Sequence, residues 1–562
     1  MRWFFKSDYK SFYLLNATQF LGALNDNIFK LLVIYLFIHV KGAAAAASIL
    51  SLAGAIFVIP FLLFSSGAGV LADKISKRTI IVITKALEVV TMMFAVLSVY
   101  LQSEFGAYTC LFFMATQSAL FGPSKYGIIP ELVEEKQVSK ANGSITSFTY
   151  LAIILGTFLA SFITDITNKN FVLESLFCVL IAIVGLFTSL GIARTAPQRS
   201  PKNINPFFFY EIYQTLKTSW TVPHLLTAMF SSAFFLFIGA YTQLNIIPFA
   251  MQSLHLSEVG GGYLFLATAV GIAIGAVLAG QLSKDKVEPG ISCIAGFFIA
   301  LFFFTLSFFS SSLVCTIISL TLLGIVGGGF LVPFDSFIQV NAPDEKRGQV
   351  IAAANFFSFV GVLLAAFGLY VISEELGFTA ASGFALMGAL SLCASVVISG
   401  RLSSFFLPFF VQKILKKFRK LEIASPLPGS SDLIILQSNS WWDAILLFSC
   451  LPKLKILLPD RYFRRFPWFN GLVDSIQIVS PNAPLTQFFE TAKKLQQKNN
   501  AVCLFLHKRI DSEEVIEAYK KVFGRFHYKM MFAHVSKEKI SKRFLFFRFP
   551  LKQIKMTFSK EP

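Results

Sequence analysis

Four polar side chains interrupt an apolar stretch near the start of the chain. The stretch ALNDNIFKLL, residues 23–32, contains Asn25, Asp26, Asn27 and Lys30 among apolar residues. A carboxylate beside two amides suits an ammonium group, because it combines a negative charge with hydrogen-bond acceptors. On a helix, Asp26 and Lys30 lie four residues apart on one face and can form a pair. These residues therefore either lock helices together or line a cavity that binds a charged ligand.

A second pair of charged residues lies in a later apolar run. Lys85 and Glu88 are three residues apart, so they also share a helical face. An ionised side chain inside a membrane costs about 2.5 kcal/mol or more on insertion scales, so such residues usually face a bundle interior and have partners. We interpret Lys85 and Glu88 as a structural ion pair, with a role in ligand binding as the alternative.

Further along, two more polar residues lie near the end of an apolar run. Gln117 can contact a ligand headgroup or make a hydrogen bond between helices. Lys125 can contact the same ligand, extend its charge to the membrane surface, or join a gate with Asp335 and Glu131. The sequence does not choose among these three interpretations of Lys125.

The composition requires a membrane around these residues. Of 562 residues, 55% are hydrophobic and 14% are charged, and the mean hydropathy is +0.67. A soluble globular protein cannot bury so large an apolar fraction. The first residues lack the small-residue cleavage site of a signal peptide, so we expect the first apolar run to be retained as a membrane helix.

Apolar runs long enough for a bilayer of roughly 30 Å extend to about residue 400. We predict about twelve membrane helices, and thus an all-α polytopic membrane protein. The predicted spans lie near residues 12–38, 45–71, 79–101, 105–123, 144–164, 170–193, 222–250, 260–283, 290–310, 312–335, 350–372 and 377–400.

Lysine and arginine collect in alternate connections between these spans. Examples are DKISKR, EEKQVSK and DEKR, whereas the intervening loops hold little beyond Lys41 and Lys169. Because cytoplasmic loops carry the excess of basic residues, we predict that both termini are cytoplasmic. The net charge of +18 then serves orientation and attraction to anionic lipid, and no nucleic-acid partner is needed.

The seven cysteines form no CxxC motif. Neither a disulfide framework nor a thiolate metal site is indicated, and we expect no metal or other cofactor.

Two sequence motifs recur at nearly the same offset. GVLADKISKR begins at Gly69 and GQLSKDK begins at Gly280, 211 residues later; FGPSKYG with Pro123 corresponds to LVPFDSF with Pro333, 210 residues later. Such repeats predict two parallel halves of six helices related by a pseudo-two-fold axis along the membrane normal. Lys125 and Asp335 then occupy equivalent places, one in each half.

The first of these motifs resembles the GxLADRxGRR loop of the major facilitator superfamily. The matching residues, with Ser76 in place of the usual glycine, are Gly69, Leu71, Ala72, Asp73, Lys74, Lys77 and Arg78. The resemblance implies that the aspartate and the basic residues hold neighbouring helices together at the cytoplasmic face. The loop is specific for the fold but says nothing of the substrate.

FLGALNDNIFKLL and FGPSKYGIIPEL resemble the bacterial lysophospholipid transporter branch of that superfamily. The resemblance covers roughly residues 12–400. It implies a transporter of the inner membrane, not an enzyme. The expected substrate is lysophospholipid, in particular lysophosphatidylethanolamine, which would be moved to the cytoplasmic leaflet by alternating access for reacylation. First helices line the cavity in this superfamily, so Asp26 becomes the favoured substrate contact. A basic residue expected in the seventh helix is missing, and a transporter of another amphiphile or a drug is the alternative.

Composition changes after residue 400. Residues 401–430 predict an amphipathic linker, and residues 431–562 predict a small cytoplasmic α/β domain that resembles glycerolipid acyltransferases. The full division is a first bundle (1–193), a central cytoplasmic loop (194–218), a second bundle (219–400), the linker and this last domain.

The catalytic residues of that acyltransferase family do not carry over. Ser438 stands where the family has its histidine, four residues before Asp443, and the phosphate-binding FPEG block reads FLHK at 505–508. We predict an inactive domain on a monomeric transporter, with acyl transfer or acyl activation left to a separate enzyme. A bifunctional transporter-acyltransferase, with His507 as a substitute base, is the alternative.

Overall fold

The computed structural model describes most of the helical region and the strands of the C-terminal region. The described residues are 10–41, 46–197, 208–256, 258–283 and 286–411, then 421–423, 433–438, 447, 451, 454–459, 476–479, 491–494, 497, 501–507, 530–544 and 547–559. The chain divides into two compact units, Met1–Ala394 and Ser395–Pro562.

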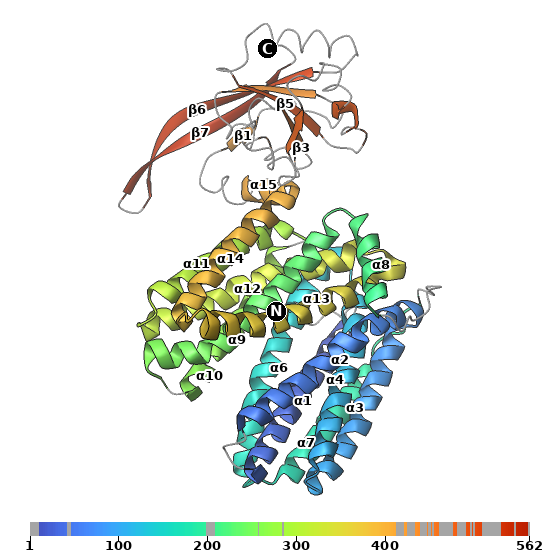
Figure 1. Cartoon of the computed structure of the whole chain (residues 1–562). Coiled ribbons are helices and arrows are strands. Elements are labelled where there is room, and N and C mark those ends of the chain that lie inside the picture. Colours follow the sequence, from blue (N-terminus) through green and yellow to red (C-terminus); the bar gives the residue numbers. More distant parts are fainter. Residues whose placement is uncertain are drawn as a thin grey trace. The chain divides into compact units, whose positions relative to one another are not determined.

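Long apolar helices form the first unit (Figure 1). The first half contains α1 (Lys10–Lys41), α2 (Ala46–Lys74), α3 (Lys77–Tyr100), α4 (Glu104–Gly127), α6 (Val138–Ile166) and α7 (Phe171–Leu190). The second half contains α9 (Leu225–Leu254), α10 (Glu258–Leu282), α11 (Pro289–Phe308), α12 (Leu313–Asn341), α13 (Arg347–Tyr370) and α14 (Ala380–Arg401). Shorter helices of this unit are α5 (Ile129–Leu132) and α8 (Phe208–Trp220). The last residues of α14 and the short helix α15 (Ser403–Phe409) belong to the second unit.

Eleven helices among the described residues are long and apolar enough to cross a membrane. The remaining predicted span, near 105–123, is the 24-residue helix α4, which is not among the eleven. Polar residues such as Gln117, Ser118 and Ser124 interrupt its apolar run. The twelve predicted helices therefore correspond to these eleven helices and α4. The segment predicted as a central loop, residues 194–218, contains most of the helix α8.

The two halves use equivalent helices in equivalent ways. Pro123 and Pro333, the prolines of the repeated motif, lie inside α4 and α12, the fourth long helix of each half. A proline is tolerated inside a membrane helix where neighbouring helices satisfy the freed backbone groups. Between the halves, α2 packs on α13 and α6 packs on α10.

We call the end of the bundle at Lys74, Lys77, Lys136 and Arg347 the basic end. At this end the seams between the halves are closed by backbone contact. A Cβ atom added at Gly69 of α2 would lie 2.7 Å from the Gly348 carbonyl oxygen of α13, and one at Gly280 of α10 would lie 2.9 Å from the Lys140 Cα of α6. These crossings therefore require glycine.

The second unit contains a seven-stranded sheet in the order β1-β7-β6-β2-β5-β3-β4. The strands are β1 (Leu421–Ile423), β2 (Leu433–Ser438), β3 (Leu454–Pro459), β4 (Ile476–Val479), β5 (Ala501–His507), β6 (Met530–Phe544) and β7 (Phe547–Ser559). All neighbours pair in parallel except β6 with β7.

A mostly parallel sheet is typical of α/β domains, the class that the sequence predicts for residues 431–562. Its strand β1 lies in the segment predicted as the linker. The register pairs Ser438 of β2 with His507 of β5. Asp443 and Lys508 lie outside the described residues. Acyltransferase ancestry, like the inactivity of the domain, stays a prediction.

Candidate functional site

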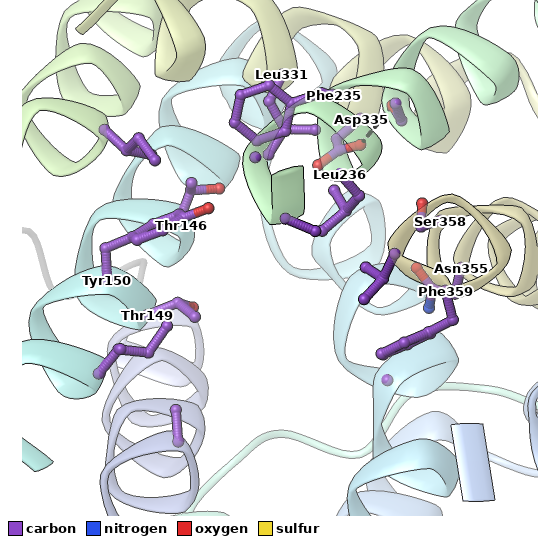
Figure 2. A pocket seen from close by; sticks show the side chains of 18 of the residues that line it. Thr146, Thr149, Tyr150, Phe235, Leu236, Leu331, Asp335, Asn355, Ser358 and Phe359 are labelled. Carbon is purple, nitrogen blue, oxygen red and sulfur yellow. Dashed lines mark hydrogen bonds between the residues drawn. The ribbon is translucent and has the colours of Figure 1, made fainter. Parts of the chain in front are cut away.

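A cavity of about 580 Å³ lies between the two halves of the helical unit. That volume is in the range of small-molecule sites. Figure 2 shows Thr146, Thr149 and Tyr150 on α6 at one side, and Phe235 and Asp335 from the second half at another. Every long helix of the first half except α7, and every one of the second half except α14, contributes to the lining.

Asp26 lies in the cavity wall with one oxygen bonded and one unbonded. Ser118 of α4 donates a hydrogen bond of 2.8 Å to Asp26 Oδ2. Asp26 Oδ1 is buried and has no hydrogen-bond partner among the described residues. A buried carboxylate oxygen without a donor is costly, so this atom is suited to receive a hydrogen bond or a positive charge from a ligand.

Lys30 does not pair with Asp26, although the spacing permits it. Its ammonium nitrogen lies 5.3 Å from the centroid of the Phe57 ring, within the range of a cation–π contact. Both Lys30 and Asp26 line the cavity. In the described part of the chain, neither has an ion-pair partner within 4.0 Å. The Asp26–Lys30 pair that the spacing permits is therefore not formed, and both charges are available to a ligand.

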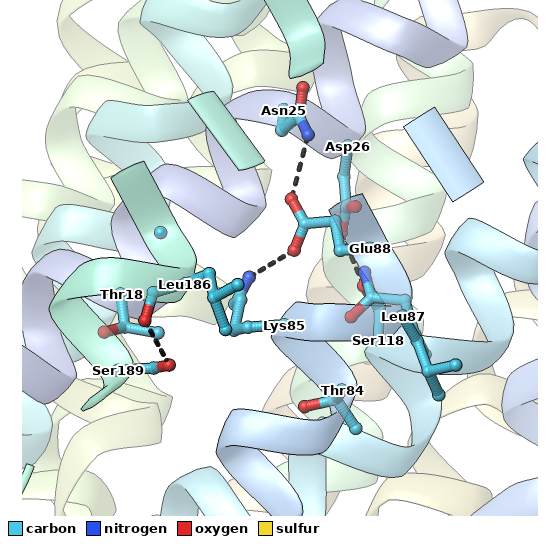
Figure 3. A network of polar contacts seen from close by, with 12 residues as sticks. Thr18, Asn25, Asp26, Thr84, Lys85, Leu87, Glu88, Ser118, Leu186 and Ser189 are labelled. Carbon is cyan, nitrogen blue, oxygen red and sulfur yellow. Dashed lines mark hydrogen bonds and ion pairs between the residues drawn. The ribbon is translucent and has the colours of Figure 1, made fainter. Parts of the chain in front are cut away.

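The predicted ion pair on α3 is present and buried (Figure 3). Lys85 Nζ lies 2.5 Å from Glu88 Oε2, and both side chains are at most 2% exposed. Asn25 donates a 2.8 Å hydrogen bond to the other oxygen of Glu88. A Cβ atom at Gly22 would lie 2.2 Å from Lys85 Nζ, so α1 leaves room for the ammonium group only because it carries glycine there. Lys85 also lines the cavity.

Asn25 and Gln117, which the sequence predicts as ligand contacts, do not line the cavity. Asn25 is fully buried against Glu88. Gln117 is 2% exposed and donates a 2.9 Å hydrogen bond to Ser118, the residue that bonds Asp26. Their placement indicates that they position other polar groups. Asn27 does line the cavity, and its side chain donates to the Ala23 carbonyl.

Lys125 and Asp335 both line the cavity, from α4 and α12. Lys125 Nζ lies 4.5 Å from the centroid of the Tyr126 ring, and Asp335 accepts a 3.0 Å hydrogen bond from Ser232. Neither has an ion-pair partner within 4.0 Å among the described residues. A gate of Lys125, Asp335 and Glu131, one of the roles open for Lys125, is not assembled here, because Glu131 pairs with Lys77 at 2.5 Å.

Asp73 joins the two halves at the basic end. Its carboxylate accepts hydrogen bonds from the backbone amides of Gly348 (2.6 Å) and Gln349 (3.0 Å) and from the Gln349 side chain (3.1 Å). These amides begin α13, and a negative charge is favourable at a helix N-terminus. We call this contact the Asp73 clasp. Arg78, from the same motif, donates to the carbonyls of Leu190 and Ile192 at the end of α7.

A reciprocal amide pair joins the halves a second time. Asn142 of α6 and Gln339 of α12 each donate to the other, at 3.0 and 2.9 Å, and Asn142 also donates to Ser336. All three residues are at most 2% exposed. The Gln339 carbonyl accepts from Arg347, the residue before Gly348, so this pair and the Asp73 clasp are connected. The sequence repeat gave no signal for Asn142 or Gln339.

Sequence reasoning also missed several hydroxyl groups of the cavity wall. These are Tyr126, Thr146, Thr149, Tyr150, Ser232 and Ser358. They carry no charge, and a hydroxyl in an apolar run is common in membrane helices that face one another. Among the described residues, no group of three His, Cys, Asp or Glu side chains is placed to hold a metal ion.

Two helical halves surround a charged central cavity, and contacts between the halves close one of its ends. This arrangement is typical of membrane transporters. The family model of the Major Facilitator Superfamily matches residues 15–366. The chain belongs to this superfamily.

Curated relatives include the lysophospholipid transporter LplT of Klebsiella pneumoniae, which is 25% identical over 386 residues, 67% of this chain and 93% of the relative. The protein of the same name from Yersinia pestis is 22% identical over 365 residues, 64% of this chain and 86% of the relative.

Solved structures with the same fold include the human organic anion transporter MFSD10, with 15% identity and a TM-score of 0.59. The alignment covers 70% of this chain and 100% of the MFSD10 chain. A bacterial homologue of the iron transporter ferroportin, in an outward-facing state, is 14% identical with a TM-score of 0.57. The alignment covers 70% of this chain and 99% of the ferroportin homologue.

We predict that Asp73→Ala opens the basic end. Hydrogen bonds to a charged group contribute about 1.5–3 kcal/mol each, so losing the clasp shifts the equilibrium between closed and open states by about tenfold or more. Pulsed EPR between spin labels at the exposed positions Lys136 and Glu345, in a background without native cysteines, measures this shift. The control is Asp165→Asn, an exposed carboxylate near the other end of α6. An unchanged distance distribution in Asp73→Ala would contradict the clasp.

We also predict that Lys85→Met strongly destabilises the first half. Breaking a buried ion pair on one side leaves an uncompensated charge, which costs about 3–5 kcal/mol. The double variant Lys85→Met/Glu88→Leu removes both charges and recovers most of the loss, leaving only Asn25 without its partner. Thermal unfolding of the purified protein in detergent compares the three chains. If the double variant is no more stable than Lys85→Met, the pair is not the source of the stability.

Proposed function

We propose that this protein transports lysophospholipid between the leaflets of the bacterial inner membrane by alternating access. The observation that carries the proposal is a cavity in the middle of the membrane helices with charges of both signs that lack ion-pair partners in the described residues: Asp26, Lys30, Lys125 and Asp335. Because such charges are costly in a membrane, their presence favours a ligand that carries both a positive and a negative charge.

A zwitterionic headgroup meets this requirement. Its ammonium group suits the unbonded Oδ1 of Asp26, and its phosphate suits Lys30 or Lys125, because a phosphate accepts several charge-assisted hydrogen bonds. The names of the relatives from Klebsiella pneumoniae and Yersinia pestis support the same class of ligand. Lysophosphatidylethanolamine, with one acyl chain and this headgroup, is the ligand we propose.

The basic loops indicate which end of the cavity faces the cytoplasm during transport. They favour a cytoplasmic location for the basic end and for both termini. In the structure, the Asp73 clasp and the Asn142–Gln339 pair close that end. Opening of these contacts would release the ligand to the cytoplasmic side, where a separate acyltransferase or acyl-activating enzyme would act on it. We propose a monomer, since one chain contributes both halves of the cavity.

A transporter of another amphiphile or drug is the second candidate, because the charged cavity and the Asp73 clasp would serve either. Acyl transfer by the C-terminal domain is a weaker candidate. The position of the family's histidine is Ser438, and nothing in the family match, which ends at residue 366, extends to that domain.

We predict that Asp26→Asn abolishes most transport of lysophosphatidylethanolamine. Asparagine keeps the size of the side chain but removes the negative charge that faces the ammonium group. Loss of a charge-assisted contact of about 1.5–3 kcal/mol lowers the rate at low substrate by roughly tenfold to a hundredfold. The assay follows labelled lysophosphatidylethanolamine between leaflets of liposomes containing the purified protein. Asp165→Asn is the matched control, and no transport by the native chain would refute the proposed function.

We predict that Asp335→Asn changes headgroup preference. Removing a negative charge from the cavity disfavours an ammonium-bearing headgroup and favours an anionic one. The ratio of rates for lysophosphatidylethanolamine and lysophosphatidylglycerol should fall by about fivefold or more, as expected for a loss of about 1 kcal/mol. Competition between the two lipids in one liposome preparation measures this ratio directly. If both rates fall equally, Asp335 acts in the gate and not on the headgroup.

A further inference from the structure

An antiparallel ribbon of two strands extends from the sheet of the second unit (Figure 1). β6 and β7 pair with each other along almost their whole length. Their other neighbours reach only a short way, because β2 pairs with β6 at residues 530–533 and β1 pairs with β7 at residues 554–556. Beyond these positions, β6 and β7 have only each other as strand neighbours among the described residues. We call this part, residues 538–544 paired with 547–553, the ribbon.

One face of the ribbon is cationic. In an antiparallel pair, residues directly opposite each other share a face, and successive residues alternate between the two faces. Lys539 lies opposite Lys552, and Arg543 lies opposite Arg548, so all four are on one face. The single pair between them is uncharged. Like charges placed directly opposite each other destabilise a strand pair. An anionic partner on this cationic face would therefore stabilise the ribbon.

The opposite face of the ribbon is mostly apolar. Ile540 lies opposite Leu551, and Phe544 lies opposite Phe547. Phe549 shares this face, between the two pairs. The remaining residues of the apolar face are Glu538, Lys542 and Gln553. A hairpin of two strands is marginally stable in water unless its apolar face packs on something else. The ribbon thus calls for one partner that is both apolar and anionic.

We propose that the ribbon binds the anionic lipid surface of the membrane that the chain itself spans. In this complex its apolar face enters the boundary between headgroups and acyl chains, as the apolar face of an interfacial amphipathic helix does. The basic residues reach the lipid phosphates, because long basic side chains can extend along apolar surface to a charged layer. Residues 537–555 contain seven lysine or arginine residues and one acidic residue. Clusters of this size next to a membrane typically recognise anionic lipid.

A lipid surface accounts for both faces of the ribbon. The phosphates of a nucleic acid would match the cationic face but would leave the apolar face without a partner. The chain also keeps the ribbon within reach of lipid. β1 begins at Leu421, 20 residues after α14 ends at Arg401. A segment of that length spans at most about 70 Å when fully extended. The basic loops favour a cytoplasmic C-terminus, and the cytoplasmic leaflet carries the negative surface potential.

The two faces of the ribbon provide a matched pair of probe positions. Gln553→Cys is on the apolar face, and Ser541→Cys is on the cationic face. Each substitution is made in the full chain without native cysteines and is labelled with the fluorophore NBD, whose emission increases in lipid. The labelled chains are reconstituted into nanodiscs of phosphatidylcholine alone, or of phosphatidylcholine with one-third phosphatidylglycerol. The label at position 541 is then the control for the label at position 553.

We expect the label at position 553 to gain emission in anionic nanodiscs and to be protected from aqueous iodide. The label at position 541 should stay accessible to iodide. High salt should reverse the gain, because exposed charges are screened. Each basic residue near an anionic surface contributes about fivefold, so Arg543→Gln/Arg548→Gln should lower the ratio of bound to free ribbon about twenty-five-fold. The control Lys493→Gln/Lys494→Gln removes the same charge from exposed positions of the same unit and should change nothing.

Three results would overturn the proposal. The first is the same emission from position 553 in neutral and anionic nanodiscs at low salt, which is measured without any charge variant. The second is an equal loss of signal in the arginine and lysine double variants, because the charge of the whole unit would then be responsible. The third is a gain of emission when RNA is added to neutral nanodiscs, which would make the ribbon a nucleic-acid-binding element. None of these readouts requires transport, so they are independent of the proposed function.

Discussion

The cost of placing charge inside a membrane governs the arrangement of the first half. Glu88 has both carboxylate oxygens bonded, one to Lys85 and one to Asn25, and the glycine at position 22 provides the space that the ammonium group needs. This network joins α1 to α3 by polar contacts that are favourable only because each group has a partner. Next to it on α1, Asp26 has one bonded oxygen and one unbonded oxygen. The satisfied network gives the incompletely satisfied carboxylate a fixed position in the cavity wall.

The closed end depends on a different kind of contact. The Asp73 clasp uses backbone amides of α13, and it forms only because Gly69 and Gly348 let α2 and α13 approach closely. Arg347 connects this contact to the Asn142–Gln339 pair through the Gln339 carbonyl. Opening one seam therefore withdraws support from the other, which favours a cooperative change between two states.

The sequence predicted the membrane spans, the two halves and the Lys85–Glu88 pair, because hydropathy and helical spacing are local properties. It could not predict the partner of Asp73, since that partner is a backbone amide 275 residues away and backbone amides have no sequence signature. Neighbouring residues on a helix point about 100° apart, so Asn25, Asp26 and Asn27 cannot all face one cavity. Lys30 lies four residues after Asp26 and three after Asn27, so helical spacing groups it with these two and could have separated Asn25 from them.

Lys125 and Asp335 occupy equivalent positions of the two repeats and carry opposite charges. In an assembly of two identical six-helix subunits, both positions would hold the same residue, and like charges would face one another across a membrane cavity of low dielectric constant. Duplication within one polypeptide removes that restriction, since each copy can then accept substitutions independently. The asymmetry of the binding site is in this sense a consequence of covalent fusion.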